Sequence, residues 1–215
     1  YAVLKEYITT NPCQYVPVPK NLKQTCRELP EDSDIESVKN SVNCTFGLFA
    51  YLILYTGLRR GEALALQYKD FDFDRKIIHI TKSVSHAHNV PEVKEPKTAA
   101  GTRDVILLDC LADKIPKLKQ NDYLFSNSKG EVLHGSNFNR LWDKYVEETG
   151  VKLTPHQLRH AYATILFEAG INDKDAQTLM GHSSINLTRD IYTHIREKRM
   201  SETAGKLNQY VSKVR

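Results

Sequence analysis

Hydrophobic residues gather in one nearly uninterrupted run at residues 46–55, and elsewhere they recur at helical or strand spacing. Because this run is apolar on every side, it predicts a helix that is buried on most of its faces. Thr56-Gly57 ends the helix, and a second helix is predicted to begin near Arg60 or Gly61. The more polar residues 31–40 have helical spacing and lead into the run.

Strands are predicted in the middle of the chain. Residues 71–85 show the alternation and the isoleucine content of strands, with residues 72–76 as turn material. The following residues 94–108 predict a hairpin whose tip lies at residues 99–102, which places Lys97 beside the turn. Together with the helices, these strands predict an α+β fold that is mainly α-helical and contains a small antiparallel β-sheet.

Capping residues divide the last third of the chain into helices. A Thr-Pro pair marks the N-terminus of one of them, because threonine can cap a helix and proline fits its first position. Glycines end three of them. The predicted helices are 137–149 (capped by Ser136, ended by Gly150), one from Pro155 (capped by Thr154, ended by Gly170), 173–180 (capped by Asn172, ended by Gly181) and one from Thr188 to the C-terminus.

The N-terminal residues 1–10 are predicted to be the end of a helix that Asn11-Pro12 closes, followed by an extended, proline-rich linker at residues 16–20. We therefore expect a domain boundary here, with residues 21–199 as the main domain and residues 200–215 as a C-terminal tail. Because the chain opens on a tyrosine in what is predicted to be mid-helix, we expect it to be a fragment of a longer protein.

The composition is that of an ordinary globular protein, with 40% of the 215 residues hydrophobic and 26% charged. The net charge of +4 permits a nucleic-acid partner without requiring one. Four widely spaced cysteines without a Cys-x-x-Cys pair suggest neither a disulfide framework nor a zinc cage, so a reduced, intracellular protein is expected. The apolar run is about half as long as a membrane span requires, and no signal pattern opens the chain.

Candidate chemistry concentrates in the last third of the chain. His156 and Arg159 lie three residues apart, and therefore on one face of the first turns of their helix. A helix N-terminus favours an anion, and a histidine beside the planar fork of an arginine suits an oxyanion such as phosphate. Further on, His182 could add a phosphate ligand and Tyr192 a hydroxyl nucleophile. Taken singly, each of these residues is more often structural, and a tyrosine on an amphipathic helix is usually a core residue.

The chain carries, in order, Leu58-Arg59-Arg60-Gly61-Glu62, Lys97, His156-x-x-Arg159-His160, Gly181-His182 and Tyr192. This order resembles the tyrosine recombinases, in particular the integrases of phages and conjugative transposons. The resemblance covers residues 34–199, and its strength lies in six residues of the right type in the right order. Residues 1–12 further resemble the last helix of the core-binding domain that precedes the catalytic domain in such integrases.

The resemblance implies a site-specific recombinase that cleaves and rejoins double-stranded DNA through a 3′-phosphotyrosyl intermediate, without metal, ATP or another cofactor. Tyr192 would attack a phosphodiester, and Arg59 and Arg159 would hold its non-bridging oxygens. Lys97 would protonate the leaving 5′-oxygen. His156 would contact the phosphate and help to remove the tyrosine proton, while His182 would donate a further hydrogen bond.

Two residues are expected to support this site. Glu62 would orient Arg59, and His160 is expected to be a buried histidine bonded to backbone rather than a chemical group. The alternatives that stay open are Arg60 in place of Arg59, Lys94 or Lys82 in place of Lys97, Tyr210 in place of Tyr192, and a metal-binding role for His86-x-His88, which is more simply a solvated loop.

The resemblance also implies partners: double-stranded DNA at core or attachment sites, a homotetramer on that DNA and an excisionase-type accessory factor, with no membrane. The protein would serve the integration or excision of a mobile element in the bacterial cytoplasm, at the nucleoid. The tail, residues 200–215, would pack onto a neighbouring protomer or fold back on its own domain. Two other functions stay open, a type IB topoisomerase-like relaxation of DNA and a DNA-binding regulator without turnover.

Overall fold

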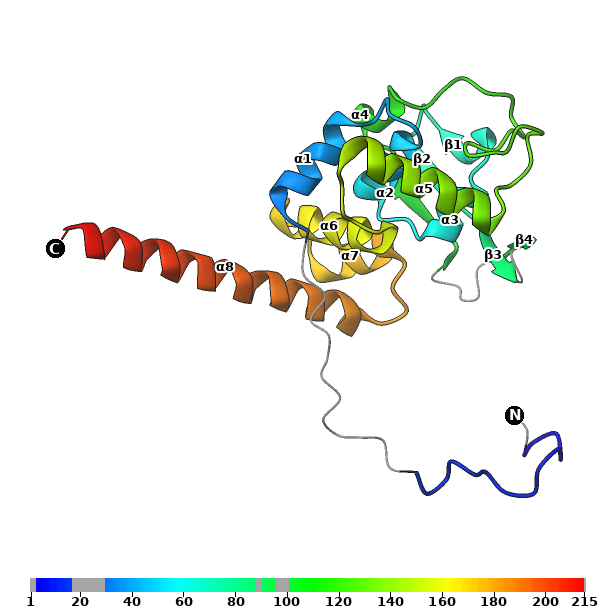
Figure 1. Cartoon of the computed structure of the whole chain (residues 1–215), viewed down its shortest axis with the longest axis horizontal. Coiled ribbons are helices and arrows are strands. Elements are labelled where there is room, and N and C mark those ends of the chain that lie inside the picture. The colour runs from blue at the N-terminus through cyan, green and yellow to red at the C-terminus, as the bar shows by residue number, and fades with distance from the viewer. Residues whose placement is uncertain (1–2, 17–29, 88–89, 96–100, 215) are drawn as a thin grey trace.

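The computed structural model describes residues 3–16, 30–87, 90–95 and 101–214. It has a mainly helical body from which one long helix projects (Figure 1), and two small antiparallel sheets, so the predicted α+β class is confirmed. The helices are α1 (Asp32–Asn40), α2 (Gly47–Thr56), α3 (Arg60–Ala65), α4 (Asp109–Ala112), α5 (Gly135–Thr149), α6 (Pro155–Glu168), α7 (Asp173–Met180) and α8 (Ile185–Val214). The strands are β1 (Phe71–Asp72), β2 (Ile77–Ile80), β3 (Ser83–Ala87), β4 (Val90–Lys94) and β5 (Arg103–Ile106).

The core is built around α2, the nearly all-apolar helix that the sequence predicts. Phe49, Leu52 and Leu54 of this helix are completely buried, and α6 packs along it. The helix ends at Gly57, which has a left-handed backbone and donates its N–H to the carbonyl oxygen of Ile53. The turn between α2 and α3 is buried at Gly57 and Leu58, and the chain becomes exposed at Arg59, where α3 is about to begin.

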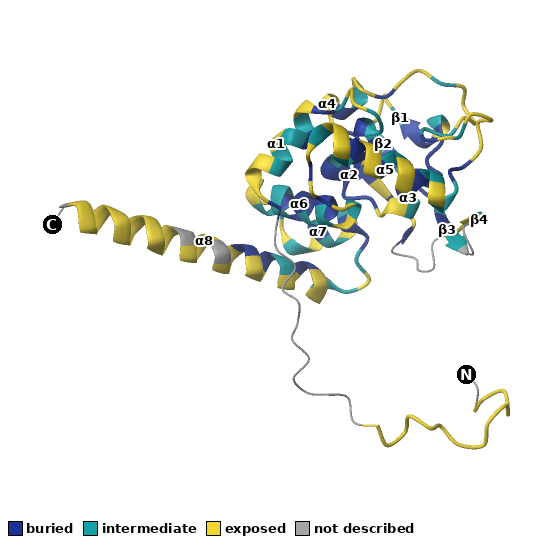
Figure 2. Ribbon diagram, in the orientation of Figure 1, coloured by how far each residue is buried: buried dark blue, intermediate teal, exposed yellow. Residues whose placement is uncertain are grey.

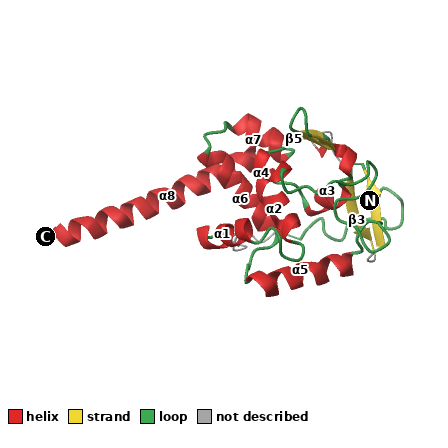
Figure 3. Ribbon diagram, turned by 90° about the horizontal axis from the view of Figure 1, so that it is seen from above, coloured by secondary structure: helices red, strands yellow, loops and turns green. Residues whose placement is uncertain are grey.

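The strands form two small sheets and not the hairpin predicted at residues 94–108. β5 pairs with β2, whereas β4 pairs with β3. The hairpin prediction is wrong because the inward-facing residues of β5 need a buried partner strand. Arg103 and Val105 of β5 lie opposite the buried Ile80 and Ile78 of β2, whereas β4 is mostly exposed and offers no buried face. Figure 3 shows the strands at the end of the body opposite to the direction in which α8 projects.

The helices of the C-terminal third follow the predicted caps closely. α5 ends at Gly150 and α7 at Gly181, both with a positive φ, and the hydroxyl of Thr154 accepts a hydrogen bond from the backbone N–H of Gln157 to cap α6. The cap predicted at Ser136 is wrong, because α5 begins one residue before it and Ser136 therefore lies inside the helix.

The C-terminal helix α8 is continuous from Ile185 to Val214. Its first turns pack against α6 and α7 and bury Tyr192 and Ile195, whereas every described side chain from Arg196 onward is exposed (Figure 2). The prediction that the tail could fold back on its own domain is therefore wrong for residues 200–214, because this part of the helix extends away from the body (Figure 1). Exchange of the tail between protomers stays a prediction.

The N-terminal residues 3–16 form turns and bends, so the helix predicted for residues 1–10 is not observed. The apolar residues of this segment, such as Leu4 and Tyr7, are exposed, and an amphipathic helix needs a packed face to be stable. Most of the predicted linker and Lys97 lie outside the described residues. Among the helices that the structure describes, none is long and apolar enough to cross a membrane.

Candidate active site

Two glycine turns form the floor of the candidate site. Gly57 follows α2 and Gly181 follows α7, and both have a φ of 62°. A Cβ at Gly181 would lie 2.7 Å from Nη1 of Arg103, and a Cβ at Gly57 would lie 2.2 Å from the ring of Tyr162. Both turns therefore need a residue without a side chain, and their backbone carbonyl groups face the arginines described below.

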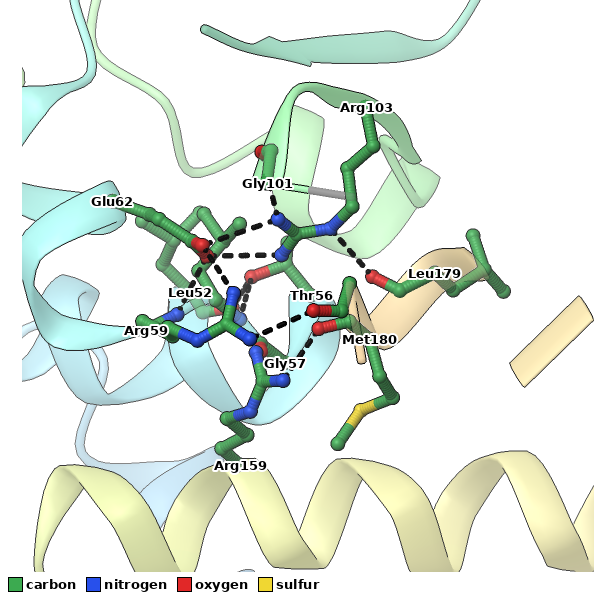
Figure 4. Close-up of polar contacts among 12 residues, drawn as sticks. Leu52, Thr56, Gly57, Arg59, Glu62, Gly101, Arg103, Arg159, Leu179 and Met180 are labelled. Carbon is green, nitrogen blue, oxygen red and sulfur yellow. Dashed lines mark hydrogen bonds and ion pairs between the residues drawn. The ribbon is translucent and has the colours of Figure 1, made fainter. Parts of the chain in front are cut away.

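Arg159 reaches these turns from α6. Thr154-Pro155 starts this helix as predicted, so Arg159 lies in its second turn, where only 5% of the residue is exposed. Its Nη1 donates to the carbonyl oxygen of Gly57 at 2.5 Å and its Nη2 donates to that of Met180 (Figure 4). Burial, and after it the positive charge of Arg59, lower the pKa of Arg159 to about 9, which still leaves a cation at neutral pH.

Arg59 approaches the same turns from the N-terminus of α3, where it is the N-cap residue. Its side chain is 46% exposed, and its Nη1 lies 2.7 Å from Oε1 of Glu62. Its Nη2 donates to the carbonyl oxygen of Gly181 at 2.7 Å. The neighbouring Arg60 points elsewhere, with its guanidinium 5.1 Å from the ring centre of Phe138. The geometry thus supports Arg59 over Arg60 as the arginine of the site.

A further arginine, Arg103 at the start of β5, shares the carboxylate of Glu62 and was not predicted from the sequence. Its Nη2 lies 2.9 Å from Oε2 of Glu62, its Nη1 lies 3.2 Å from Oε1, and its Nε donates to the carbonyl oxygen of Leu179 at 3.0 Å (Figure 4). Burial would raise the pKa of Glu62, but the hydrogen bonds and charges of Arg103 and Arg59 outweigh it and lower this pKa. The sequence held one signal for the burial of Arg103: it lies two residues before the apolar Val105, and therefore on the same inward face of the strand.

Three histidines belong to this part of the molecule. The Nε2 atoms of His156 and His160 lie 3.0 Å apart; His160 is half-buried, where a buried ring bonded to backbone was predicted. Nδ1 of His182 lies 2.9 Å from the hydroxyl of Thr188, a buried residue that was also not predicted from the sequence. Burial, and after it the charge of Arg159, lower the pKa of His182 to about 4, so this ring is neutral at neutral pH.

Tyr192 is not brought to the arginines. It is 3% exposed, its ring centre lies 5.1 Å from that of Phe167, and its hydroxyl donates to the carbonyl oxygen of Ile171 at 3.3 Å. Ile171 precedes α7, whereas the arginines bind the carbonyl groups of residues 179–181 at the C-terminal end of this helix; its eight residues separate the two ends by about 12 Å. Burial, and after it the charge of Asp173, raise the pKa of Tyr192, which is the opposite of what a nucleophile needs.

The predicted general acid is not placed, because Lys97 lies outside the described residues. The two alternative lysines have partners of their own: Lys94 pairs with a glutamate of its own strand at 2.7 Å, and Nζ of Lys82 lies 3.3 Å from a glutamine oxygen. The alternative nucleophile, Tyr210, is 69% exposed near the far end of α8. These positions favour Tyr192 over Tyr210 and leave Lys97 as a prediction.

The metal-binding alternative receives no support from the described part of the chain. Nε2 of His86 lies 2.9 Å from the carbonyl oxygen of Leu133, and His88 is outside the described residues. In the ranges that the structure covers, no group of three or more histidine, cysteine, aspartate or glutamate side chains is arranged to hold a metal ion.

The groups that converge on the two turns carry a surplus of positive charge. Arg59, Arg103 and Arg159 contribute three positive charges and Glu62 one negative charge, which gives a net charge of +2. Guanidinium forks match the oxygens of phosphate, so a cluster of this kind can bind an oxyanion. Because Arg59 is half-exposed, the cluster is open to solvent on its side.

Comparison with known proteins identifies the family of the chain. The model of the phage integrase family matches residues 24–199. A XerC-like tyrosine recombinase of Caldanaerobacter subterraneus is 29% identical, over 97% of this chain and 62% of that protein. The tyrosine recombinase XerC of Pelotomaculum thermopropionicum is 31% identical, over 96% of this chain and 69% of that protein.

A similar solved structure is that of the Tn1549 transposon integrase in complex with transposon right end DNA. It has a TM-score of 0.68 and 24% identity, and the match covers 95% of this chain and 75% of that one. This likeness shows the fold, which is that of a tyrosine recombinase catalytic domain. The chain spans 62% of the length of the XerC-like relative. Because the family match extends over residues 24–199, the chain belongs to the phage integrase family of tyrosine recombinases.

Proposed function

We propose that this chain is the catalytic part of a site-specific recombinase that cleaves and rejoins double-stranded DNA during integration or excision of a mobile element. The observation that carries the proposal is the pair of guanidinium groups, Arg59 and Arg159, that meet at two glycine turns within a cluster of net charge +2. Family membership supports it. The proposed catalytic residues are Arg59, Lys97, His156, Arg159, His182 and Tyr192, with Glu62 and His160 in support.

The arginines would bind the scissile phosphate. As Tyr192 attacks, negative charge builds up on the non-bridging oxygens of a pentacoordinate phosphorus, and fixed cations stabilise that charge more than they stabilise the ground state. Arg159 is held by two backbone carbonyl groups, and Arg59 by a carboxylate and one carbonyl group. Both forks are therefore oriented before DNA arrives.

His182 would act as a neutral hydrogen-bond donor. Its low pKa keeps the ring uncharged at neutral pH. When the hydroxyl of Thr188 donates to Nδ1, the ring carries its proton on Nε2, which can then donate to a phosphate oxygen. His156 would contact the phosphate and accept the proton of Tyr192, and the neighbouring ring of His160 would orient it.

The reaction would form one bond and break one. The oxygen of Tyr192 attacks phosphorus, the bond from phosphorus to the 5′-oxygen breaks, and Lys97 gives that oxygen a proton. A 3′-phosphotyrosyl bond and a free 5′-hydroxyl result; rejoining reverses these steps, so the bond energy is kept and ATP is not consumed. Tyr192 must first leave the carbonyl group of Ile171 and move towards the arginines.

The exposed half of α8 would bind a neighbouring protomer on DNA. Met200, Leu207, Tyr210 and Val211 are all more than half exposed. Their spacing of three, four and seven residues puts them on one helix face, and an apolar face without cover is typical of an interaction site. The partner would be another copy of this chain in a tetramer that works in the bacterial cytoplasm, at the nucleoid, and an excisionase-type factor would set the direction of recombination.

The test is covalent capture. The protein is incubated in EDTA with a set of nicked duplexes that tile the DNA flanking its own gene, since a nick near the cleavage position makes cleavage irreversible. We expect a slow-migrating band on a denaturing gel that persists in the Tyr210→Phe variant and is lost in Tyr192→Phe. A band in Tyr192→Phe would refute the nucleophile, and binding of these duplexes without any band would refute strand cleavage.

A further inference from the structure

Arg103 differs from the other arginines of the site because its charge faces only protein. Its side chain is 4% exposed. Its Nε donates to Leu179, its Nη1 donates to Glu62 and to the carbonyl oxygen of Gly101 at 3.2 Å, and its Nη2 donates to Glu62. A guanidinium with these bonds cannot turn to a phosphate without breaking them.

These bonds join three segments that are far apart in the sequence (Figure 4). Arg103 stands at the start of β5, Glu62 belongs to the first turn of α3, and Leu179 belongs to the last turn of α7. The turn after α7 lies directly against the guanidinium, since a Cβ at Gly181 would be within 2.9 Å of three of its atoms. Arg103 thus touches both structures that hold Arg59, the carboxylate and the turn.

The path from Arg103 to Arg59 is short. The carboxylate of Glu62 accepts the fork of Arg103 on both oxygens, and the same two oxygens bind Nη1 and the backbone N–H of Arg59. Arg59 is half-exposed and has a long, flexible side chain. Its orientation therefore depends on a carboxylate that Arg103 fixes in place.

We propose that Arg103 is a positioning residue of the recombination reaction: it holds Glu62 and the turn after α7 so that Arg59 and Arg159 face the scissile phosphate. The inference rests on the proposed function. The competing explanation is an ion pair that only stabilises β5 within its sheet. The two differ in what they predict for the rate of cleavage when the stability of the fold is preserved.

The first comparison is between Arg103→Lys and Arg103→Met. Lysine keeps the charge beside Glu62 but lacks the fork that spans both carboxylate oxygens and a carbonyl group. We expect Arg103→Lys to unfold at a temperature close to that of the wild type, yet to form the covalent adduct about tenfold to a hundredfold more slowly at saturating DNA, with DNA affinity unchanged. Arg103→Met, which removes the charge as well, should cleave at least as slowly. Wild-type cleavage by Arg103→Lys would overturn the proposal.

The second comparison asks whether Arg103 acts through Arg59. Residues that act as one unit do not have additive effects. The double variant Arg59→Lys with Arg103→Lys should therefore cleave no more than about threefold more slowly than Arg59→Lys alone. If the two losses multiply, Arg103 does not act through Arg59 and the proposal fails.

A third measurement uses a duplex with a methylphosphonate at the scissile position. This group has no negative charge, so orientation of Arg59 for charge neutralisation matters less. The loss in Arg103→Lys should shrink to about threefold on this DNA, whereas a general structural defect would slow both substrates equally. Tyr145→Phe is the matched control: it removes the hydroxyl that lies 2.8 Å from Ser41, is buried away from the arginines, and should leave the ratio of the two rates unchanged.

The wild type serves as the reference in all three comparisons. If the wild type itself forms no adduct on any duplex, the proposed function fails and this inference fails with it. If the wild type forms the adduct and the Arg103 variants behave like Tyr145→Phe, only this inference fails.

Discussion

The arginine cluster and the tyrosine helix are held in opposite ways. Arg159 and Arg103 are buried and bonded to carbonyl or carboxylate groups from several elements. Arg59 shares the carboxylate of Glu62 with Arg103 and also binds the carbonyl oxygen of Gly181. Within the described part of the chain, the hydroxyl of Tyr192 has one hydrogen bond, to Ile171 at the other end of α7, and its helix is exposed beyond its first turns. The arginine half of the proposed reaction centre is therefore assembled, whereas the tyrosine half lies apart from it.

The chemistry of the two kinds of side chain explains this difference. A buried guanidinium is stable only where its charge is solvated by fixed dipoles or carboxylates, so its binding site must be built into the fold. A phenol is neutral and can be buried in an apolar environment with one hydrogen bond. In the proposed reaction, the position of Tyr192, and not the state of the arginines, would therefore control whether the site can react.

The largest expected effect is on the rate of cleavage when an arginine of the assembled cluster is removed. Arg159→Ala should slow formation of the covalent adduct about 10³-fold, or about 4 kcal/mol of transition-state stabilisation, because a preorganised oxyanion partner is lost. Single-turnover cleavage of the nicked duplex measures this. Arg75→Ala, an exposed arginine on a turn, is the control and should cleave like the wild type. A loss below about tenfold in Arg159→Ala would contradict a preassembled phosphate site.

The next effect is on stability. Glu62→Gln should lower the free energy of unfolding by about 3 kcal/mol at neutral pH, because it leaves buried Arg103 without a counter-charge. The folded-state pKa of Glu62 lies below the ordinary value of 4.5, so its contribution is present above that pH and is lost as the pH falls through the lower folded value. Urea unfolding at several pH values should therefore show the variant and the wild type converging in acid.

The control for this prediction is Glu36→Gln. Glu36 forms an exposed pair with Lys39, and its loss should change stability by less than about 0.5 kcal/mol. If both variants lose the same stability, or if the difference for Glu62 persists unchanged into acid, the buried carboxylate does not hold the cluster together.

A smaller effect is expected at the turn after α7. Gly181→Ala should destabilise the fold by about 2 kcal/mol, from the strain of a left-handed alanine and from contact with the guanidinium of Arg103. Gly150→Ala isolates the strain, because Gly150 has a similar φ of 71° but no atom within 4 Å of the position that a methyl group would take. We expect it to cost about 1 kcal/mol. If thermal unfolding shows the same loss of stability in Gly181→Ala and Gly150→Ala, the turn after α7 is not in close contact with Arg103.

The smallest effect should appear on the tyrosine half, at the contacts that dock α8. The guanidinium of Arg199 lies 5.4 Å from the ring centre of Phe167 and pairs with Glu168, which helps to dock α8 on α6. Arg199→Ala should weaken this docking by about 0.5 kcal/mol and speed adduct formation about twofold, since Tyr192 is released more often. Lys206→Ala, further along the exposed helix, should have no effect. A slower Arg199→Ala variant would mean that docking of α8 aids the reaction.

Much of the fold was predictable because its signals are local. The apolar run gives α2, and Thr154, Asn172 and Gly181 set the ends of α6 and α7 through bonds within a few residues. The turns that carry Arg59 and the helix that carries Arg159 followed from these signals. The pairing of β5 did not, because it depends on which distant strand offers a buried face.

Of the predicted site residues, the structure brings Arg59, Glu62 and Arg159 together, but their geometry and the part of Arg103 in it were not predictable from the sequence. Nothing near Arg103 in the sequence marks it as the partner of Glu62, a residue 41 positions earlier. The displacement of Tyr192 also has no local signal, because it depends on where α8 docks on α6 and α7. The prediction of an N-terminal helix was wrong for a related reason. The apolar side chains of the described segment are exposed, so no packed face stabilises a helix there.

The continuity of α8 has a mechanical consequence. Its 30 residues make a rod about 45 Å long, with Tyr192 near the docked end and Tyr210 near the free end. A rod that pivots at its docked end converts a large swing of the free end into a small displacement of the near one. A neighbouring protomer that bound the free end, as proposed, would therefore shift Tyr192 by a small distance, with the contacts of α8 at Phe167 as the pivot.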